Sequence, residues 1–312
     1  MKCLILGGAG FIGSHLAQGL LAAGHQVRIF DRPNLVLPPE LLADARIEWL
    51  EGDFLNEDDL ARVVPGSEVI FQLVSATLPK SSNDNPVYDV ESNIIGTLRL
   101  LNLARTYAVK RVIFASSGGT IYGLPHTLPI SESHSTEPLV SYGISKLAIE
   151  KYLHLYQALY GIDYCVLRIA NPFGERQRVS AAQGAVAVFL HRAMNDEVIH
   201  IWGDGSVVRD YIYVKDVTSA FIRALSYHGE QRVFNIGAGQ GLSLNDILTA
   251  IEKLLGRPVP RSYEPGRKFD VPVNVLDITR ARELLGWQPE VSFHDGLVQT
   301  LAWMRNNQHA VL

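Results

Sequence analysis

The chain has 312 residues, with 28 lysines and arginines against 32 aspartates and glutamates, giving a formal net charge of −4. No basic tract or stripe points to nucleic acid, and no apolar run reaches the length of a membrane span. The 47% hydrophobic content is that of a globular protein with an ample core, in one large or two moderate domains. Both cysteines, Cys3 and Cys165, fall in expected buried strands and are expected to be reduced. We therefore expect a cytoplasmic enzyme, with neither nucleic acid nor membrane as a partner.

The chain begins with an expected strand, a glycine-rich turn and a helix. Residues 2–6 form a short apolar run, and Gly7, Gly8, Gly10 and Gly13 follow it. The spacing G-x-G-x-x-G is met by Gly8, Gly10 and Gly13, and a wider pattern by Gly7, Gly10 and Gly13. Such glycines permit a tight turn, let a pyrophosphate approach the backbone and place it at the positive end of the helix. An ordinary tight turn is the alternative, but the flanking strand and helix favour a dinucleotide site.

A second strand, expected over residues 26–30, ends at Asp31. An acidic residue about twenty positions beyond the glycines can accept hydrogen bonds from the adenosine ribose. Its charge would repel a 2′-phosphate and so favours NAD over NADP. Arg32 could instead bind that phosphate, and a simple strand-end turn is the other alternative.

Strands and helices continue to alternate along the first half of the chain. Further strands are expected at residues 46–51, 68–74, 111–115 and 162–169. This alternation predicts an α/β fold with a Rossmann-type, doubly wound parallel sheet.

Two domains are expected. An NAD-binding Rossmann domain should cover residues 1–171, and residues 172–312 should form mainly a smaller C-terminal α/β substrate-binding domain. Residues 211–236 are expected to return to the first domain as a helix and a strand. Segments 175–209 and 238–312 are expected to hold helices without matching strands.

Polar residues lie at the expected cofactor cleft. Ser75 follows the fourth strand, and a loop containing Ser117 and Thr120 follows the fifth. Ligands in such sheets bind beyond the carboxyl ends of the strands. Asn93, inside a helical stretch over residues 88–108, could face solvent or could be a site ligand that kinks the helix.

Tyr142 and Lys146 are four positions apart on an expected helix over residues 142–159, so both project from one face. A phenol, with a pKa of about 10, is a poor base at neutral pH. A neighbouring ammonium and a positive nicotinamide ring are expected to lower that pKa. The pair therefore suits the interconversion of an alcohol and a carbonyl, and Lys146 could also hold the nicotinamide ribose.

Several motifs in order give the chain a family resemblance. They are GGAGFIG at 7–13, Asp31, GDF at 52–54, NIIGT at 93–97, SSGGTIYG at 116–123, YGISK at 142–146, LRIANPFG at 167–174 and VRDYIYVKDV at 208–217. With these motifs the chain resembles the extended short-chain dehydrogenase/reductase superfamily. Within it, the chain is most similar to the UDP-glucose 4-epimerase-like branch of the NAD-dependent epimerase/dehydratase family, over essentially its whole length.

The resemblance implies NAD as cofactor and a set of cofactor-binding residues. Some would contact the pyrophosphate, the adenosine ribose or adenine, and others would line the nicotinamide end. They are Gly7, Gly10, Phe11, Ile12, Gly13, Asp31, Arg32, Asp53, Phe54, Leu73, Val74, Ser75, Asn93, Tyr142, Lys146 and Ala170.

The resemblance also implies that Tyr142 is the catalytic acid/base and Lys146 its partner. The family's catalytic serine or threonine is replaced here by Gly118, so Ser117 or Thr120 is expected to contact the sugar 4-OH, and we favour Thr120. Family dehydratases carry an Asp-Glu pair where this chain has Gly119 and Thr120, which argues against 4,6-dehydration.

The remaining implied contacts are to the nucleotide sugar. They are Asn171, Arg209 and Arg267 at the diphosphate, Asp270 near the uridine ribose, and Asn274, whose moderate size is compatible with an N-acetylated sugar, in addition to Ser117, Gly118, Thr120 and Tyr142. An arginine fork suits a diphosphate, although either arginine could also be a surface charge.

The resemblance implies a C4 epimerase of a UDP-hexose (UDP-glucose/galactose or N-acetyl forms) that acts through a transient 4-keto sugar. The alternatives are a dehydratase or reductase of the same family and a catalytically silent NAD-binding regulator. No metal is expected. The family also implies a role in carbohydrate metabolism, including polysaccharide biosynthesis, and a homodimer formed by helices at 88–108 and 142–159.

Overall fold

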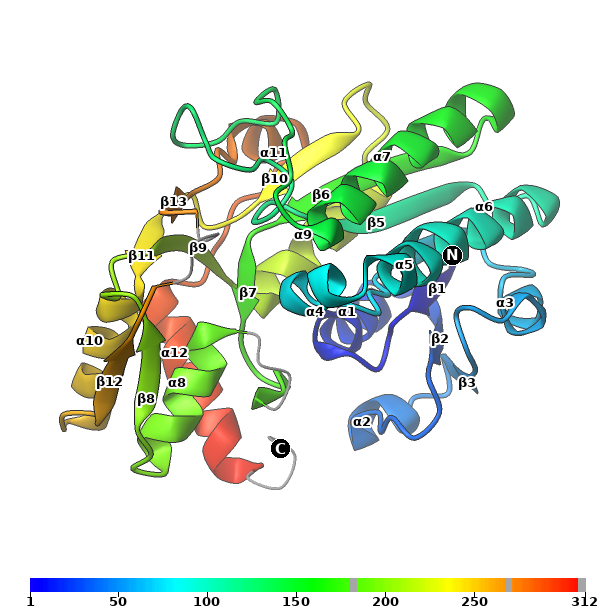
Figure 1. Ribbon diagram of the computed structural model, residues 1–312. Helices are drawn as coiled ribbons and strands as arrows, with labels where there is room; N and C mark the ends of the chain where they lie inside the picture. Colours follow the sequence, from blue (N-terminus) through cyan, green and yellow to red (C-terminus); the bar gives the residue numbers. More distant parts are fainter. Residues whose placement is uncertain (180–183, 267–270, 308–312) are drawn as a thin grey trace. The chain divides into compact units, whose positions relative to one another are not determined.

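The computed structural model describes residues 1–179, 184–266 and 271–307 (Figure 1). The chain forms two compact units. The first unit contains Met1–Ile121, Thr136–Arg168 and Thr218–Phe234, and the second contains Tyr122–Ser135, Ile169–Val217 and Asn235–Leu312.

These units differ from the expected domain boundary in two places. Residues 122–135 cluster with the second unit, where Ile130 forms a parallel bridge with Leu276 and Tyr122 donates a hydrogen bond to Asn235. Residues 211–217 also belong to the second unit, because strand pairing there continues through Tyr213. It stays a prediction that the first domain binds NAD and that the second binds the nucleotide-sugar substrate.

A seven-stranded sheet forms the centre of the first unit. Its strands, in spatial order, are β10 (Val233–Ile236), β6 (Asp163–Ile169), β5 (Arg111–Ser117), β4 (Val69–Gln72), β1 (Lys2–Leu6), β2 (Gln26–Asp31) and β3 (Ile47–Glu51). The pairs β2–β3, β1–β2, β1–β4 and β4–β5 are parallel. The strand order reverses between β1 and β4, the place where open α/β sheets bind ligands. The predicted Rossmann-type α/β fold is confirmed.

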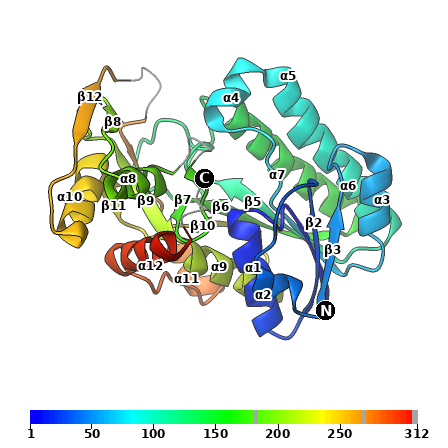
Figure 2. The ribbon, with the colours of Figure 1, turned by 90° about the horizontal axis from the view of Figure 1, so that it is seen from below.

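Helices cover both faces of this sheet (Figure 2). One face carries α3 (Glu57–Val63), α6 (Gly96–Thr106) and α7 (Ser141–Tyr160), and the other carries α1 (Phe11–Ala22) with residues 218–226 of α9 (Val214–Ser226). Shorter elements are α2 (Pro39–Leu42), α4 (Pro79–Asp84), α5 (Pro86–Asp89) and the π-helix η1 (Val90–Ile95).

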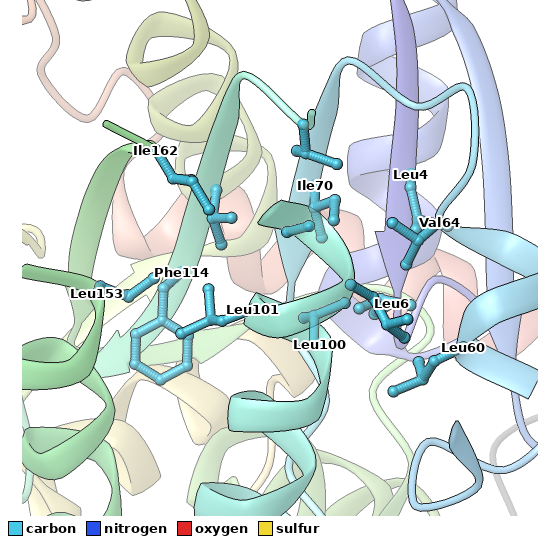
Figure 3. Close-up of a cluster of buried hydrophobic side chains, with 14 of the residues drawn as sticks. Leu4, Leu6, Leu60, Val64, Ile70, Leu100, Leu101, Phe114, Leu153 and Ile162 are labelled. Carbon is cyan, nitrogen blue, oxygen red and sulfur yellow. The ribbon is translucent and has the colours of Figure 1, made fainter. Parts of the chain in front are cut away.

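The core under α3, α6 and α7 explains the near-continuous apolar character of the strands (Figure 3). Leu6, Ile70 and Phe114 of the sheet pack with Leu100 of α6 and Leu153 of α7, and each is at most 2% exposed. When both faces of a strand are buried, apolar residues occupy successive positions and do not alternate with polar ones. Burying each such side chain stabilises the fold by roughly 1.5–3 kcal/mol.

The second unit contains several short strands. They are β7 (Asn171–Phe173), β8 (Ile199–Trp202), β9 (Val208–Tyr213), β11 (Gly241–Ser243), β12 (Arg261–Glu264) and β13 (Val273–Asn274). β9 pairs with β7, β11 and β13, and β8 pairs with β12. The helices are α8 (Ala185–Met194), α10 (Leu244–Leu255), α11 (Thr279–Leu284) and α12 (Phe293–Asn306).

The expectation that segments 175–209 and 238–312 lack strands is therefore wrong. Strands as short as the two residues of β13 are too brief for an alternating pattern to emerge. Within the described ranges, no helix has both the length and the apolar character needed to cross a bilayer.

Candidate active site

The glycine-rich loop between β1 and α1 is packed so closely that side chains are excluded. A Cβ on Gly13 would lie 2.2 Å from the Gly7 carbonyl oxygen and 2.6 Å from the Cα of Gly8. Gly7 itself has a φ of 82°, which L side chains rarely adopt. The loop can therefore bring its backbone close to a bound group.

The beginning of α1 provides donors for that group. Gly10 is the N-cap and no side chain caps the helix, so the amides of its first turn, including those of Phe11 and Ile12, have no partner within the helix. Asp31, at the end of β2, accepts hydrogen bonds from the amides of Ala9 (3.0 Å) and Arg32 (2.9 Å). The predicted pyrophosphate and ribose residues thus lie together, and this cradle fits a dinucleotide.

Other predicted cofactor residues lie at the same edge or close to it. A Cβ on Gly7 would be 3.2 Å from the amide nitrogen of Val74 and 3.5 Å from Cβ of Leu73. Asp53 accepts a hydrogen bond from the Leu55 amide. The ring of Phe54 is buried against Gly96, so the predicted adenine contact of this residue would involve its backbone.

Asn93 faces inward from the π-helix η1, so the solvent-facing alternative is wrong. Its side chain is 4% exposed, and its Oδ1 accepts a hydrogen bond from the Ala76 amide at 3.2 Å. Its Nδ2 donates to Thr77 at 3.1 Å and to Asp89 at 2.9 Å. The single helix expected over residues 88–108 is interrupted here, as is frequent at functional sites.

Tyr142 and Lys146 lie in the first turns of α7. The Tyr142 amide donates to Oγ of Ser82 at 3.0 Å. Lys146 Nζ donates to the Ala115 carbonyl at 2.8 Å and lies 4.7 Å from the ring centroid of Phe114 and 5.5 Å from that of Tyr142. The ammonium thus lies beside the phenol at the carboxyl end of β5, as the sequence predicts.

Burial dominates the acid–base properties of the pair. It raises the pKa of Tyr142 to about 12, the charge of Asp89 adds to this, and a hydrogen bond with Ser75 acts against it. Burial also lowers the pKa of Lys146 to about 8, against the charges of Asp89 and Glu150. In the protein alone the net shift of the tyrosine pKa is therefore upward, because desolvation of the phenolate dominates. The expected lowering by the ammonium together with the nicotinamide ring stays a prediction.

The loop after β5 packs directly on α7. A Cβ on Gly143 would lie 2.7 Å from the Thr120 carbonyl oxygen, so the helix and the loop are in close contact there. Thr120 Oγ1 is buried and has no hydrogen-bond partner among the described residues, which leaves it able to bond a ligand. Ser117 is partly exposed, whereas Gly118 is buried.

The sequence analysis did not single out two carboxylates in this region. Asp89 is fully buried and accepts hydrogen bonds from Ser141 and Ser145 of α7. Glu150 pairs with Arg168 of β6 at 2.7 Å and also accepts a 2.6 Å hydrogen bond from Ser116. The i,i+4 spacing of Lys146 and Glu150 was the one local hint, and such spacing is common on any helix.

The second unit brings together three of the predicted substrate residues. Asn171 of β7 donates from Nδ2 to the Asp210 carbonyl at 3.0 Å, and Asn274 of β13 is the register partner of Arg209 on β9. Asn274 is buried, and Arg209 donates to the Val271 carbonyl at 2.6 Å. Ala170, a predicted cofactor residue, donates its amide to the Ile236 carbonyl. Arg267 and Asp270 lie outside the described residues.

A cavity of about 280 Å³ lies beside this group of strands. Its lining residues come from the ends of β8 and β13 and from the neighbouring loops: Trp202, Gly203, Ser206, Val207, Gly266, Pro272 and Val273. Trp202 is 45% exposed, an unusual state for an indole. The sequence analysis did not single out this residue.

The first unit defines a Rossmann-type protein with a Tyr–Lys pair, and comparisons with known proteins agree. Residues 3–237 match the family model of the NAD dependent epimerase/dehydratase family. A UDP-glucose 4-epimerase of Mycolicibacterium smegmatis is 38% identical over 98% of this chain and 99% of its own.

Solved structures give the same result. The UDP-glucose 4-epimerase of Thermotoga maritima, bound to UDP-glucose, has a TM-score of 0.93 and 37% identity, covering 99% of this chain and 100% of its own. The UDP-glucose 4-epimerase of Thermus thermophilus, in complex with NAD, has a TM-score of 0.88 and 31% identity, covering 98% and 99%.

The chain belongs to the NAD-dependent epimerase/dehydratase family. The resemblance drawn from its motifs is confirmed, as is NAD as the cofactor. The comparisons also support the predicted activity, that of an NAD-dependent nucleotide-sugar epimerase, with UDP-sugars as the substrate class.

Proposed function

We propose that this protein interconverts the C4 epimers of a UDP-hexose, with Tyr142 as the acid/base. The observation that carries this proposal is the Tyr142–Lys146 pair, which lies at the carboxyl end of β5 in the same unit as the glycine-rich loop. UDP-glucose, UDP-galactose and their N-acetyl forms are the substrates that the resemblance implies.

When bound, NAD would supply a reversible hydride acceptor for C4 of the sugar. Asp31 and the amides of Phe11, Ile12 and Gly13 would hold it, and the tight loop, in which the Gly10 amide donates to the Gly7 carbonyl at 3.2 Å, would let the backbone approach it. The remaining cofactor residues assigned above would line the rest of its site.

The chain's own residues move the proton. The phenolate of Tyr142 accepts the proton of the 4-OH as C4 becomes a ketone, and it returns that proton when the alcohol re-forms. Lys146 stabilises the phenolate as an ammonium within 5.5 Å of the ring centroid. Thr120, with its buried and unpartnered hydroxyl, hydrogen-bonds the same sugar oxygen, and Ser117 is the other candidate.

The second unit would bind the nucleotide. Arg209 provides a cation for the diphosphate, and Asn171 lies on the neighbouring strand. The cavity beside Trp202 has room for a pyrimidine base, which could stack on the indole. Binding energy from these non-reacting groups lets the 4-keto sugar turn over without leaving the protein.

A panel of UDP-, dTDP- and GDP-sugars, with products resolved by NMR and mass spectrometry, tests the proposed activity. Epimerisation leaves the mass unchanged, whereas a dehydratase lowers it by the mass of water and a reductase raises it. Conversion of a UDP-hexose to its C4 epimer is expected. A product of altered mass would replace this function with one of the alternatives.

We also propose that the protein is a homodimer formed through residues 88–108, which include η1 and α6, and through α7. The elements α5, η1 and α7 expose large apolar side chains: Val87, Tyr88, Val90, Ile95, Ile144, Leu155, Leu159 and Tyr160. Because α6 and α7 lie side by side, two copies could form a four-helix bundle (Figure 1).

The substitution Leu159→Glu should convert a dimer to a monomer in sedimentation velocity. The matched control Leu284→Glu changes an exposed leucine of α11 and should leave the dimer intact. A monomeric wild-type protein at micromolar concentration would contradict the proposal.

We further propose that the protein acts in the cytoplasm, in carbohydrate metabolism that includes polysaccharide biosynthesis. Cys3 and Cys165 are buried free thiols, the state expected in a reducing compartment.

A further inference from the structure

Asp89 carries a buried carboxylate that joins three segments of the first unit. It is 0% exposed and accepts hydrogen bonds from the side chains of Thr77, Asn93, Ser141 (2.9 Å) and Ser145 (2.6 Å). All four donors are neutral. A buried carboxylate is costly unless such donors compensate it, so its charge is held in place by a dedicated set of hydroxyl and amide groups.

Two of these donors flank the proposed catalytic residues on α7. Ser141 directly precedes Tyr142, and Ser145 directly precedes Lys146. Both hydroxyls bond the same oxygen, Oδ2 of Asp89. Two consecutive turns at the start of α7 are therefore attached to Asp89, one through Ser141 and the next through Ser145.

Residues just before Asp89 complete the attachment. The N-cap of α7, Val140, has no side chain that can cap the helix. Instead Asn83 Oδ1 accepts the Ser141 amide at 2.9 Å, and Ser82 Oγ accepts the Tyr142 amide at 3.0 Å. The segment 82–89 thus satisfies amides that would otherwise lack partners and fixes the position of the Tyr142 backbone.

The charge of Asp89 also acts on the pair. It raises the pKa of Tyr142 and the pKa of Lys146, because an anion nearby favours the protonated form of each. The other charged or titratable group acting on Lys146 is Glu150, one turn further along α7, while Ser75 contacts the phenol. The neighbouring groups from β5 are the Phe114 ring and the Ala115 carbonyl, which do not titrate.

We propose that Asp89 is a positioning residue for the proton-transfer step: its carboxylate fixes the first turn of α7 and acts electrostatically on Tyr142 and Lys146. This inference rests on the proposed roles of those two residues. It assigns a function to a buried residue that acts through its hydrogen bonds to Asn93, Ser141 and Ser145.

The test is the pH profile of Asp89→Asn, which keeps the shape of the side chain and removes its charge. We expect kcat to fall at least tenfold while bound NAD is retained, and both limbs of the kcat/KM profile to move roughly 0.5–1 pH unit toward lower pH. If the role of Asp89 were purely structural, kcat/KM would be lower at every pH, and the acidic and alkaline limbs would stay at the same pH as in the wild type. Limbs that coincide with those of the wild type would overturn the proposal.

A matched control is Asp216→Asn. Asp216 is a buried aspartate of the second unit that accepts the amides of Glu290 and Val291. We expect this variant to lower Tm and to leave both limbs in place. Limbs that shift equally in both variants would also overturn the proposal.

A second variant serves if Asp89→Asn fails to fold. Ser141→Ala/Ser145→Ala removes both attachments of α7 and keeps the charge, so kcat should fall roughly three- to tenfold with the limbs unmoved. Wild-type kcat in this variant would overturn the proposal. Tyr142→Phe separates a failure of the proposed function from a failure of this inference. Activity in that variant contradicts the proposed function itself, whereas the Asp89 variants test only the role of Asp89.

Discussion

Lys146 Nζ donates a 2.8 Å hydrogen bond to the carbonyl oxygen of Ala115 and so joins α7 to the carboxyl end of β5. This bond holds the ammonium beside Tyr142, in a setting where Lys146 is 4% exposed. Burial there lowers the pKa of Lys146 to about 8, so its charge is lost within an accessible pH range.

The first prediction concerns the alkaline side of the pH profile. The positive nicotinamide ring is expected to bring the pKa of Tyr142 below that of Lys146, so the active form of the NAD-bound protein holds phenolate and ammonium together, and its kcat/KM should fall as the pH rises above about 8. In Lys146→Arg the guanidinium stays charged, so the alkaline limb should disappear although the maximal rate is lower. Steady-state rates between pH 6 and pH 10 provide the measurement. A Lys146→Arg profile with the wild-type alkaline limb would assign that limb to another group.

The glycine-rich loop should not tolerate a methyl group at position 13. In Gly13→Ala the new Cβ would lie 2.2 Å from the Gly7 oxygen, so the loop must move away from the start of α1. We expect the purified protein to lose its NAD, measured by absorbance after acid release. Gly161→Ala is the control: it places a Cβ in open space at the end of α7, where the positive φ costs on the order of 1 kcal/mol. This control should keep its NAD, and NAD retention by Gly13→Ala would contradict the proposed pyrophosphate site.

The buried pair of Glu150 and Arg168 should matter more when it is broken than when it is replaced. Arg168→Ala leaves the Glu150 carboxylate buried without its cation and should lower the free energy of unfolding by about 3–5 kcal/mol. The double variant Glu150→Gln/Arg168→Met should be much closer to the wild type. Urea unfolding of the three proteins checks this. Equal losses in both variants would show that the ion pair itself, rather than an unpaired charge, sets the stability.

The free energy of unfolding should depend on pH through Asp210. Burial raises the pKa of Asp210 to about 6, against hydrogen bonds from the amides of Ala238, Gly239 and Leu276. The folded state therefore holds a proton that the unfolded state releases, and this stabilisation is lost as the pH rises toward 6 and beyond. The difference in unfolding free energy between wild type and Asp210→Asn should fall by about 2 kcal/mol from pH 4.5 to pH 7. A difference that does not change with pH would contradict it.

The strand–glycine–helix unit at the start of the chain could be predicted because its determinants are local. The strand, the glycines and α1 adjoin one another, and the packing of Gly13 on Gly7 involves residues six positions apart. The Tyr142–Lys146 pair was predictable for the same reason, since helical spacing alone places both side chains on one face.

Asp89 could not be predicted because its partners are distant in sequence. Ser145 lies 56 residues away and Ser141 lies 52 residues away, and no local pattern reports such contacts. The direction in which the pKa of Tyr142 shifts in the protein alone could not be predicted from the sequence either, because it depends on how deeply folding buries the phenol. In the second unit, β13 exists only because Val273 and Asn274 pair with β9.

The most direct test of the central claim is the turnover of Tyr142→Phe with a UDP-hexose, measured on protein whose NAD content has been determined. Removing the hydroxyl eliminates the group that carries the proton and leaves the glycine-rich loop unchanged. We predict NAD content equal to that of the wild type and a rate of C4 epimerisation reduced by at least about a hundredfold. Epimerisation within tenfold of the wild-type rate would contradict the assignment of Tyr142 as the acid/base.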